Sequence, residues 1–346
     1  MKIKEKVCDF ANLHKAAWIC SKNVKWKDSV TGALMHGMQN THVLKRELDL
    51  GTYKISPYTT FKVYEPKERE IVATKFRDRV FQRSLSDHYL YDEITKRFVY
   101  DNHACQINRG TDQARKRLPV HLQKFYRKHK TSGYILKCDL KNYFGSTSHV
   151  VAKETMRKHI GNEWAYHHVE KIIESFPGDH GIGLGSQISQ LIQLAMLNEL
   201  DHIVKEQLKI KHYVRYMDDF VLIHQDKTHL KHCKEIIEKW LVGKELKLNN
   251  QKTQITPVTK PIKWLGFNFV LKPTGKIIKT LPKSRIKHEK RKLRKQVKLC
   301  KTGKITKDQL ENCFVAWKAH ASKGNTHHAV KNMENYFKKL KEMEDV

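Results

Sequence analysis

The amino-acid sequence predicts an α+β fold, in which helices and antiparallel strands occupy separate stretches of the chain. Runs rich in aromatic and β-branched residues flank the acidic pair within residues 211–224, and this pattern predicts a tight hairpin. Alternating apolar residues within 264–278 predict a second hairpin. Residues 226–246 and 283–304 instead keep apolar side chains at helical spacing. The 346 residues suffice for a sizeable core shared by two or three subdomains.

The first third of the chain is predicted to start with helices. Residues 1–50 show helical apolar spacing and end at a glycine turn. Residues 53–71 alternate, which predicts strand, and a helix is expected to open at Phe76. A further glycine turn leads into a helix over 112–128, for which Thr111 is the expected N-cap.

The middle of the chain contains an apolar strand over 133–139 that ends on a lone carboxylate, Asp139. About 80 residues separate it from the 211–224 hairpin, which is long enough for a crossover that brings the two strand ends together in one sheet. Between them, the glycine-rich segment 181–190 leads into a helix. Glycines let a backbone approach a ligand closely, so this segment predicts either a ligand contact or a loop that closes against the sheet.

The last third is predicted to be strand followed by basic helix. Residues 248–255 turn into another strand. Residues 283–304 are rich in lysine and arginine and contain a single acid, Glu289, but they keep an apolar stripe. We therefore expect a packed helix whose polar face lies along phosphates, followed by a helical pair over 308–340.

The charge of the chain predicts a polyanionic partner. Lysine and arginine number 67 against 36 for aspartate and glutamate, a formal net charge of +31. Nucleic acid is the expected partner, with solubility or attraction to a membrane surface as the weaker explanation. The sequence has no apolar run long enough for a transmembrane helix and no apolar signal core at its start. Its seven scattered cysteines indicate reduced thiols in a cytoplasmic protein, and Cys8, His14 and Cys20 fit no zinc spacing.

The adjacent carboxylates Asp218 and Asp219 predict a metal site. Neighbouring like charges repel, so a hairpin used only as scaffold would gain nothing from the pair. Mg²⁺ takes hard oxygen ligands, and two such ions can support phosphoryl transfer. Taken alone, the pair is better explained by an acidic surface turn, since turns are rich in aspartate, and the rest of the chain reverses this preference. With Asp139 brought alongside by the crossover, three carboxylates from two strands would make the minimum cage for two metals.

Several cations gather beside the predicted strand at 53–71. Lys67, Arg69, Arg77 and Arg79 supply the donors that a triphosphate needs, and arginine can grip a phosphate with two hydrogen bonds. For any single one of these residues, a solvated basic face is an equally good interpretation.

In combination, these motifs resemble those of reverse transcriptases. The shared features, in the order found in that family, are Asp139 with Phe144 five positions later, the 185–190 segment, Tyr216-Met217-Asp218-Asp219 in an apolar hairpin, Lys252 in an Asn-x-x-Lys-Thr setting, and Leu265-Gly266. The resemblance covers about residues 50–270. It implies a right-hand polymerase: an N-terminal helical extension (1–52), fingers (53–132), a palm with an antiparallel sheet (133–280, including a helix at 185–200) and a short, basic, helical thumb (281–346).

The resemblance also implies roles for individual residues. Asp139, Asp218 and Asp219, with the adjacent Leu140, would form a site for two Mg²⁺ ions, for which Mn²⁺ can substitute. Phe144 would be a steric gate that selects deoxynucleotides, and Lys252 would protonate the departing pyrophosphate. The remaining substrate contacts would come from Lys67, Arg69, Arg77, Leu184, Gly185, Gln190, Tyr216 and Met217, and the primer grip from Trp264, Leu265 and Gly266.

Within the family, the segment from Leu184 to Gln190 fits the LGxxxSQ form of reverse transcriptases from bacterial diversity-generating retroelements. Related bacterial enzymes that serve phage defence look similar, and the motif does not separate the two groups. Leu184 stands where high-fidelity relatives often have glutamine, which suggests relaxed fidelity or relaxed template dependence. The expected partners are a structured non-coding or template-repeat RNA, an RNA/DNA hybrid and dNTPs, with an accessory protein or self-association left open and no membrane partner.

Two other functions compete with reverse transcription. An RNA-directed RNA polymerase would use the same chemistry, but it normally has a Gly-Asp-Asp turn and no bulky gate, so Met217 and Phe144 argue against it. A non-catalytic RNA-binding protein with a polymerase fold is disfavoured by the presence of all three carboxylates.

Overall fold

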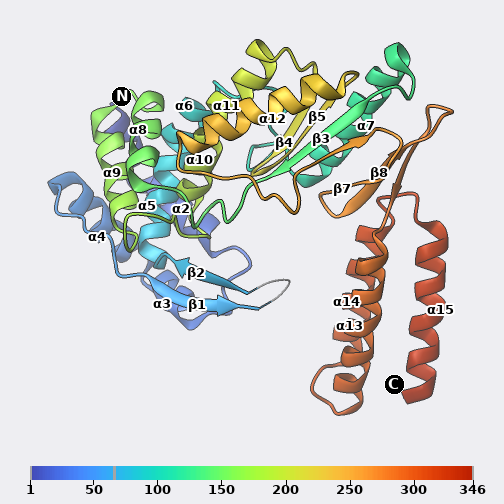
Figure 1. Cartoon of the computed structure of the whole chain (residues 1–346). Coiled ribbons are helices and arrows are strands. Elements are labelled where there is room, and N and C mark those ends of the chain that lie inside the picture. The colour runs from blue at the N-terminus through green and yellow to red at the C-terminus, as the bar shows by residue number, and fades with distance from the viewer. Residues whose placement is uncertain (1, 65–67, 345–346) are drawn as a thin grey trace. The chain divides into compact units, whose positions relative to one another are not determined.

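Three sheets and a larger number of helices make up the computed structural model, which describes residues 2–64 and 68–344 (Figure 1). The chain folds as two compact units. The first unit comprises residues 1–110, 138–220 and 232–253, and the second comprises 111–137, 221–231 and 254–346. The units thus interleave along the chain, whereas the division expected from the sequence consists of four consecutive parts. The α+β class predicted from the sequence is confirmed.

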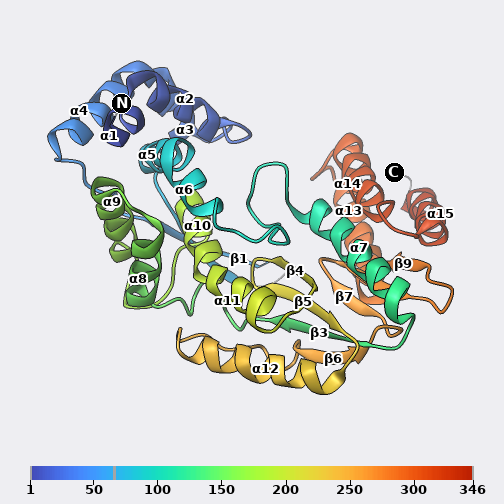
Figure 2. The ribbon, with the colours of Figure 1, turned by 90° about the horizontal axis from the view of Figure 1, so that it is seen from above.

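Helices form the start of the first unit, as predicted. In chain order they are α1 (Ile3–Val7), α2 (Phe10–Ser21), α3 (Asp28–Met35) and α4 (Gly37–Leu50). The Asp9 side chain caps α2 by accepting the Asn12 backbone N–H. The end of α4 is set by Gly51, whose φ of 71° places it in the left-handed conformation that closes a helix. These helices gather beside α5 (Phe76–Leu85), and α2 packs on α5 through its buried Leu13, Ala16 and Ala17 (Figure 2).

The stretch predicted as a single strand over 53–71 is in fact part of a two-stranded hairpin. Strand β1 (Thr59–Val63) pairs antiparallel with β2 (Arg69–Ala73), with Thr59 opposite Ala73 and Val63 opposite Arg69. Every residue of β1 is exposed, so alternation here does not mark a buried face. Alternation alone could not reveal the partner strand or where the chain reverses.

A four-stranded sheet carries the residues of greatest interest. Its strand order is β4-β5-β3-β6, formed by β3 (Tyr134–Asp139), β4 (His212–Tyr216), β5 (Asp219–His224) and β6 (Gln254–Pro257). The predicted hairpin at 211–224 is therefore confirmed as β4 and β5. The strand predicted over 248–255 begins later, at Gln254, where it pairs antiparallel with β3.

Strands β3 and β5 are neighbours of equal length that run in opposite directions. A Cβ on Gly133, which precedes β3, would lie 3.0 Å from the carbonyl oxygen of His224, which ends β5. The start of β3 thus lies beside the end of β5. It follows that Asp139, at the end of β3, and Asp219, at the start of β5, occupy the same edge of the sheet.

Helices account for most of the remainder of the first unit. Those at 149–174 were not predicted from the sequence, whereas the helix after the glycine-rich segment was. These elements are η1 (Ser86–Leu90), α6 (Tyr91–Thr95), α8 (His149–His159), α9 (Glu163–Glu174), α10 (Gln187–Met196), α11 (Asn198–His202), η2 (Ile203–Gln207) and α12 (Lys227–Val242), the last of which begins in the second unit. Within residues 2–64 and 68–344, no helix is both long enough and apolar enough to cross a membrane.

The second unit combines a long helix, a three-stranded sheet and three C-terminal helices. Its elements, besides β6, are α7 (Thr111–His129), β7 (Ile262–Trp264), β8 (Phe267–Leu271), β9 (Ile277–Thr280), α13 (Lys283–Lys301), α14 (Lys307–Ala321) and α15 (His327–Glu344). The predicted second hairpin is present as β8 and β9, and β7 adds a third strand on the other side of β8. The basic segment 283–301 forms one helix, as expected from its apolar stripe.

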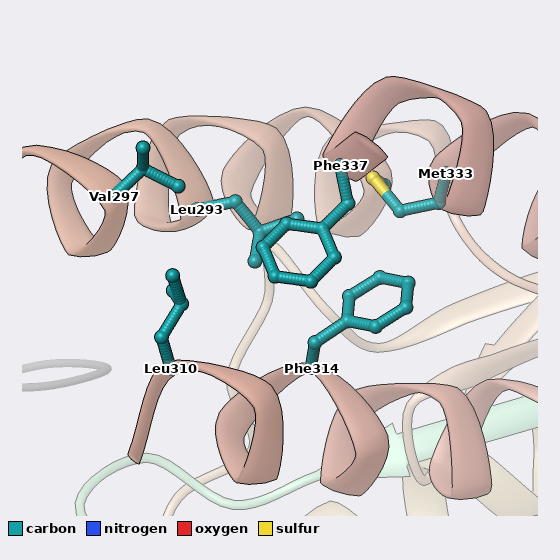
Figure 3. Close-up of a cluster of buried hydrophobic side chains, with 6 residues drawn as sticks. All are labelled: Leu293, Val297, Leu310, Phe314, Met333 and Phe337. Atoms are coloured by element: carbon teal, nitrogen blue, oxygen red, sulfur yellow. The ribbon is translucent and has the colours of Figure 1, made fainter. Parts of the chain in front are cut away.

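A hydrophobic cluster holds the three C-terminal helices together (Figure 3). Leu293 and Val297 come from α13, Leu310 and Phe314 from α14, and Met333 and Phe337 from α15. The Phe314 and Phe337 rings stack with their centroids 4.4 Å apart. Burial of these side chains is the main favourable term in forming the bundle, because most of the α13 surface is charged.

We predict that Phe314→Ala loosens this bundle, since it leaves a cavity between α13 and α15. Truncating a buried phenylalanine costs about 3–5 kcal/mol. Hydrogen exchange of amides in 283–344 should speed up by the factor that this loss of free energy implies, while exchange in the first unit stays unchanged. The control Val315→Ala removes a neighbouring side chain that is 57% exposed and should change little. Equal rates of amide exchange in Phe314→Ala and Val315→Ala would contradict the role of Phe314 in holding the bundle together.

Candidate active site at the edge of the four-stranded sheet

Three carboxylates lie at one edge of the four-stranded sheet. Asp139 ends β3, Asp219 opens β5, and Asp218 lies in the turn between β4 and β5. The Asp218 carboxylate also acts electrostatically on the hydroxyl of Tyr143, which lies four residues after Asp139. Burial raises the pKa of the Tyr143 hydroxyl well above its usual value, and the Asp218 and Asp201 carboxylates raise it further. Residues far apart in the sequence thus converge at this edge.

A buried arginine supports the turn that carries Asp218. Arg215 in β4 and Asp201 in α11 are both fully buried, and the guanidinium donates to both carboxylate oxygens, at 2.7 and 2.6 Å. The same guanidinium donates to the carbonyl oxygen of Met217 at 3.0 Å. Met217 has a φ of 53°, a left-handed conformation that costs a non-glycine residue roughly 1–2 kcal/mol. The arginine therefore helps to hold the chain in a conformation that it would otherwise avoid.

Further contacts complete this buried network. The Tyr213 hydroxyl donates to Asp201 at 2.5 Å, and Arg215 donates weakly to the Leu194 carbonyl of α10 at 3.4 Å. Burial disfavours the charged form of Arg215, but Asp201 more than offsets this effect and raises the pKa of the guanidinium. Sequence reasoning gave Arg215 and Asp201 no role. The available signal was a charged residue inside the apolar run of a strand, which has to be neutralised once it is buried.

Asp139 is held by its main chain and by a lysine. The Asn249 N–H donates to the Asp139 carbonyl at 2.7 Å, and the Lys252 ammonium donates to Asp139 Oδ1 at 2.6 Å. The Lys252 side chain is 45% exposed and that of Asp139 is 10% exposed, so solvent reaches the ammonium far more readily than the carboxylate. Leu140 is buried and pairs with Leu248 in an isolated bridge, so only its main-chain carbonyl offers an oxygen ligand.

The predicted gate Phe144 lies against the glycine-rich segment. The Ile182 N–H donates to the Phe144 carbonyl at 2.9 Å, and the Gly181 N–H donates to the Thr147 carbonyl at 2.8 Å. The Phe144 ring is half-buried and meets the Tyr143 ring edge to face, with centroids 6.1 Å apart. The structure thus joins two segments that the sequence analysis treated separately.

A cavity of about 740 Å³ lies within the first unit, beside the glycine-rich segment. Gly185, Gln187 and Gln190 line it together with Arg83 and Ile107. Leu184, which precedes them, is half-buried and is not among the lining residues. Of the predicted substrate contacts, the structure therefore places Gly185 and Gln190 in a cavity, while Tyr216 and Met217 lie half-buried at the hairpin.

The predicted triphosphate cations differ in their surroundings. Arg77 forms an ion pair with Glu47 and lies over the Tyr53 ring, so part of its charge is neutralised within the N-terminal helices. Arg69 is exposed in β2. Lys67 lies outside the residues that the structure describes. Their triphosphate role stays a prediction.

The predicted primer-grip residues belong to the second unit. Trp264 ends β7 and is buried, and Leu265 and Gly266 form the turn into β8. Both turn residues have positive φ, 43° and 90°, as tight hairpins of this length require. Arg115 of α7 donates to the Leu265 carbonyl at 2.8 Å and so supports the unfavourable conformation of that residue.

The side chains at this site are of the type that binds a divalent cation. Carboxylate oxygens are the ligands that Mg²⁺ prefers, and Asp139 already accepts a cation in the form of the Lys252 ammonium. As the side chains stand, however, no group of three or more His, Cys, Asp or Glu within residues 2–64 and 68–344 could hold a metal ion. The Lys252 ammonium occupies Asp139 Oδ1, so a metal ion at that oxygen would have to displace it.

Comparison with known proteins identifies the family. Residues 65–269, more than half of the chain, match the model of the reverse transcriptase (RNA-dependent DNA polymerase) family. The chain belongs to this family, as its motifs indicated. No curated protein sequence matches it.

Solved structures agree at the level of the fold. A telomerase from Candida albicans, in complex with a fragment of telomeric RNA, superposes with a TM-score of 0.52 and 12% identity over 76% of this chain and 55% of that one. Apo telomerase from Candida tropicalis gives 0.51 and 14% identity over 65% of this chain and 49% of that one. The chain thus spans about half the length of the telomerase chains it matches, and at this identity the likeness establishes the fold alone.

The network around Arg215 leads to a prediction that separates stability from activity. Arg215→Met leaves Asp201 buried without its charge partner, which should cost about 3–5 kcal/mol of unfolding free energy. Adding Asp201→Asn removes the uncompensated charge and keeps an acceptor for Tyr213, so part of the stability should return. Neither variant can donate to the Met217 carbonyl, and primer extension should stay at least about 10-fold below wild type in both. A stable double variant that extends primers at the wild-type rate would contradict a role of Arg215 in holding the turn.

Proposed function

We propose that this protein is an RNA-directed DNA polymerase that synthesises cDNA on an RNA template. The observation that carries the proposal is the placement of Asp139 and Asp219 at one edge of the sheet with Asp218 in the adjoining turn, in a chain that belongs to the reverse transcriptase family. The net charge of +31 suits an RNA template and an RNA/DNA hybrid. The dNTPs would supply the nucleotides.

In this proposal Asp139, Asp218 and Asp219 would hold two Mg²⁺ ions, or Mn²⁺ in their place, with Lys252 displaced from Asp139. Bound there, the ions would lower the pKa of the primer 3′-OH and stabilise the charge on the leaving oxygen. Arg215 and Asp201 keep the turn fixed, so the carboxylates need little rearrangement as charge develops. Lys252, released from Asp139, becomes free to give a proton to the departing pyrophosphate.

For the biological role, we propose a bacterial diversity-generating retroelement. The support is the sequence from Leu184 to Gln190, which has the LGxxxSQ form. An antiphage-defence enzyme that copies an associated non-coding RNA is the alternative. Sequencing the RNA and cDNA that copurify with the protein separates the two: mutated copies of a template repeat support the first role, and a fixed non-coding RNA template supports the second.

The double substitution Asp218→Ala and Asp219→Ala should lower the rate of cDNA synthesis by roughly 1,000-fold or more, because the carboxylates act as one unit. Binding of an RNA–DNA hybrid, followed by fluorescence anisotropy, should stay within about twofold of wild type, since phosphate contacts dominate affinity. EDTA should stop synthesis, and added Mg²⁺ or Mn²⁺ should restore it.

The matched control for this double variant is Asp308→Ala, which removes an exposed carboxylate in the first turn of α14. A double variant that kept both synthesis and binding would exclude the proposed site. A wild-type protein that bound hybrid but never extended it would favour the non-catalytic RNA-binding alternative.

Phe144→Ala should relax sugar selection, because it removes the ring expected to clash with a ribose 2′-OH. We expect ribonucleotide incorporation relative to deoxynucleotide to rise by about 10-fold or more. Tyr143→Phe is the matched control: it keeps the neighbouring ring and loses only the hydroxyl that donates to the Gln193 carbonyl at 2.6 Å. If Phe144→Ala still preferred deoxynucleotides as strongly as wild type does, Phe144 would not be the steric gate.

A further inference from the structure

Three aromatic side chains form a ladder along one face of α2. Phe10, His14 and Trp18 follow each other at four-residue spacing, which places them one above the other on the helix. The Phe10 and His14 rings are nearly parallel, with centroids 5.9 Å apart, and the Trp18 ring lies 6.5 Å further along. The Trp18 Nε1–H donates to His14 Nε2 at 3.2 Å. Trp18, at the end of this ladder, is 50% exposed.

A second tryptophan lies in the loop that follows α2. Trp26 is 76% exposed, with the Lys27 ammonium 5.2 Å from its ring centroid, and the Lys25 ammonium lies 4.9 Å from the Trp18 ring. We call Phe10, His14, Trp18, Trp26 and the lysines 22, 25 and 27 the aromatic–lysine surface. Two large rings left in water are unfavourable in a monomer and mark a surface that meets a partner.

The exposed rings play no part in packing α2 against the rest of the fold. The face of α2 that docks on α5 carries Leu13, Ala16 and Ala17, all of which are buried. The Cys20 thiol adds a hydrogen bond to the Arg79 carbonyl at 3.5 Å. The helix is thus anchored by one face, while Trp18 is presented to solvent on another.

The charge around the rings selects the class of partner. The sequence from Phe10 to Lys27 contains four lysines and no acidic residue. Of the two acids that flank it, Asp9 is engaged as the N-cap of α2. Cations beside exposed rings suit an anionic ligand with flat, stackable groups. They do not suit an acidic peptide without rings.

We propose that the aromatic–lysine surface binds a single-stranded stretch of nucleic acid, with unpaired bases stacked on Trp18 and Trp26 and phosphates close to Lys22, Lys25 and Lys27. Stacking on aromatic side chains needs bases whose faces are open, which a duplex does not offer. The flanking ammonium groups supply the sequence-independent attraction to the backbone. The strand is an unpaired stretch of RNA, since the chain belongs to a family of RNA-dependent polymerases, and single-stranded DNA is the alternative outcome of the test. The proposal goes beyond polymerisation and does not depend on the carboxylate site.

The test measures binding of a fluorescein-labelled 12-nucleotide oligo(U), and separately oligo(dT), to the full chain. Saturating unlabelled RNA–DNA hybrid is present, so that the polymerase site is occupied. Trp18→Ala with Trp26→Ala should weaken binding of the labelled strand by about 10-fold or more. Replacing the two tryptophans with phenylalanine keeps the rings and should restore most of the affinity. Replacing lysines 22, 25 and 27 with glutamine should flatten the dependence of affinity on salt.

The matched control is a tryptophan–lysine pair elsewhere in the first unit. Lys244 lies 5.7 Å from the Trp240 ring, but its charge is paired with Glu199 at 3.5 Å, so Trp240→Ala with Lys244→Ala should leave binding within twofold. Oligo(U) should bind more tightly than oligo(dT), and the reverse order would overturn the assignment of the surface to RNA.

The proposal is overturned if the Trp18 and Trp26 double variant and the Trp240 and Lys244 control lose affinity equally, or if neither loses any. So does tryptophan-dependent binding to phosphatidylserine vesicles without oligonucleotide binding, which would assign the surface to a membrane. The Asp218→Ala and Asp219→Ala variant should bind the labelled strand as wild type does, so failure of this proposal and failure of the polymerase proposal give different results.

Discussion

The buried ion pair between Arg215 and Asp201 is the constraint on which the geometry of the candidate site depends. Both side chains are fully buried, and removing charges from water is costly unless hydrogen bonds replace the lost hydration. Here Asp201 accepts from Arg215 and Tyr213, while Arg215 also donates to the Met217 and Leu194 carbonyls. The pair thus ties two helices, a strand and a turn into one network. Arg215 can donate to the Met217 carbonyl only when the turn has this conformation. The network therefore fixes the positions of Asp218 and Asp219, which follow Met217.

The second constraint is the charge balance at the strand edge. Carboxylates gathered at one edge of the sheet repel one another, and a cation beside them offsets this repulsion. In this structure the Lys252 ammonium supplies one at Asp139. The same lysine is the residue that the family resemblance places near the departing pyrophosphate. A lysine that moves between these two positions would link arrival of metal at the carboxylates to release of a proton donor.

Much of this arrangement could be predicted from the sequence, because local patterns determined it. The hairpin at β4 and β5 followed from aromatic and β-branched runs, and Asp139 was recognised as the last residue of an apolar strand. The basic helix α13 was identified because its apolar stripe keeps helical spacing despite its charge. The approach of Asp139 to the hairpin was expected from the length of the crossover, and metal binding from the chemistry of carboxylates. The roles of the other site residues came from resemblance to a family, and the strand order β4-β5-β3-β6 was not predicted.

What the sequence did not reveal depends on contacts between distant residues. Asp201 and Arg215 come from different elements, and no periodicity links them. The ion pair between Arg77 and Glu47, which lies 30 residues earlier in α4, was not foreseen either. The helices at 149–174 were not predicted, and the hairpin of β1 and β2 was interpreted as one strand because its exposed residues alternate without a buried face.

The central claim is that the strand edge formed by Asp139, Asp218 and Asp219 binds divalent cations once Lys252 has moved. Anomalous X-ray scattering from crystals grown with Mn²⁺ tests it most directly, because it locates the metal without reference to activity. The account predicts anomalous density bounded by these carboxylates, with the Lys252 ammonium no longer in contact with Asp139. Density elsewhere only, with the contact between Lys252 and Asp139 intact at saturating Mn²⁺, would contradict it.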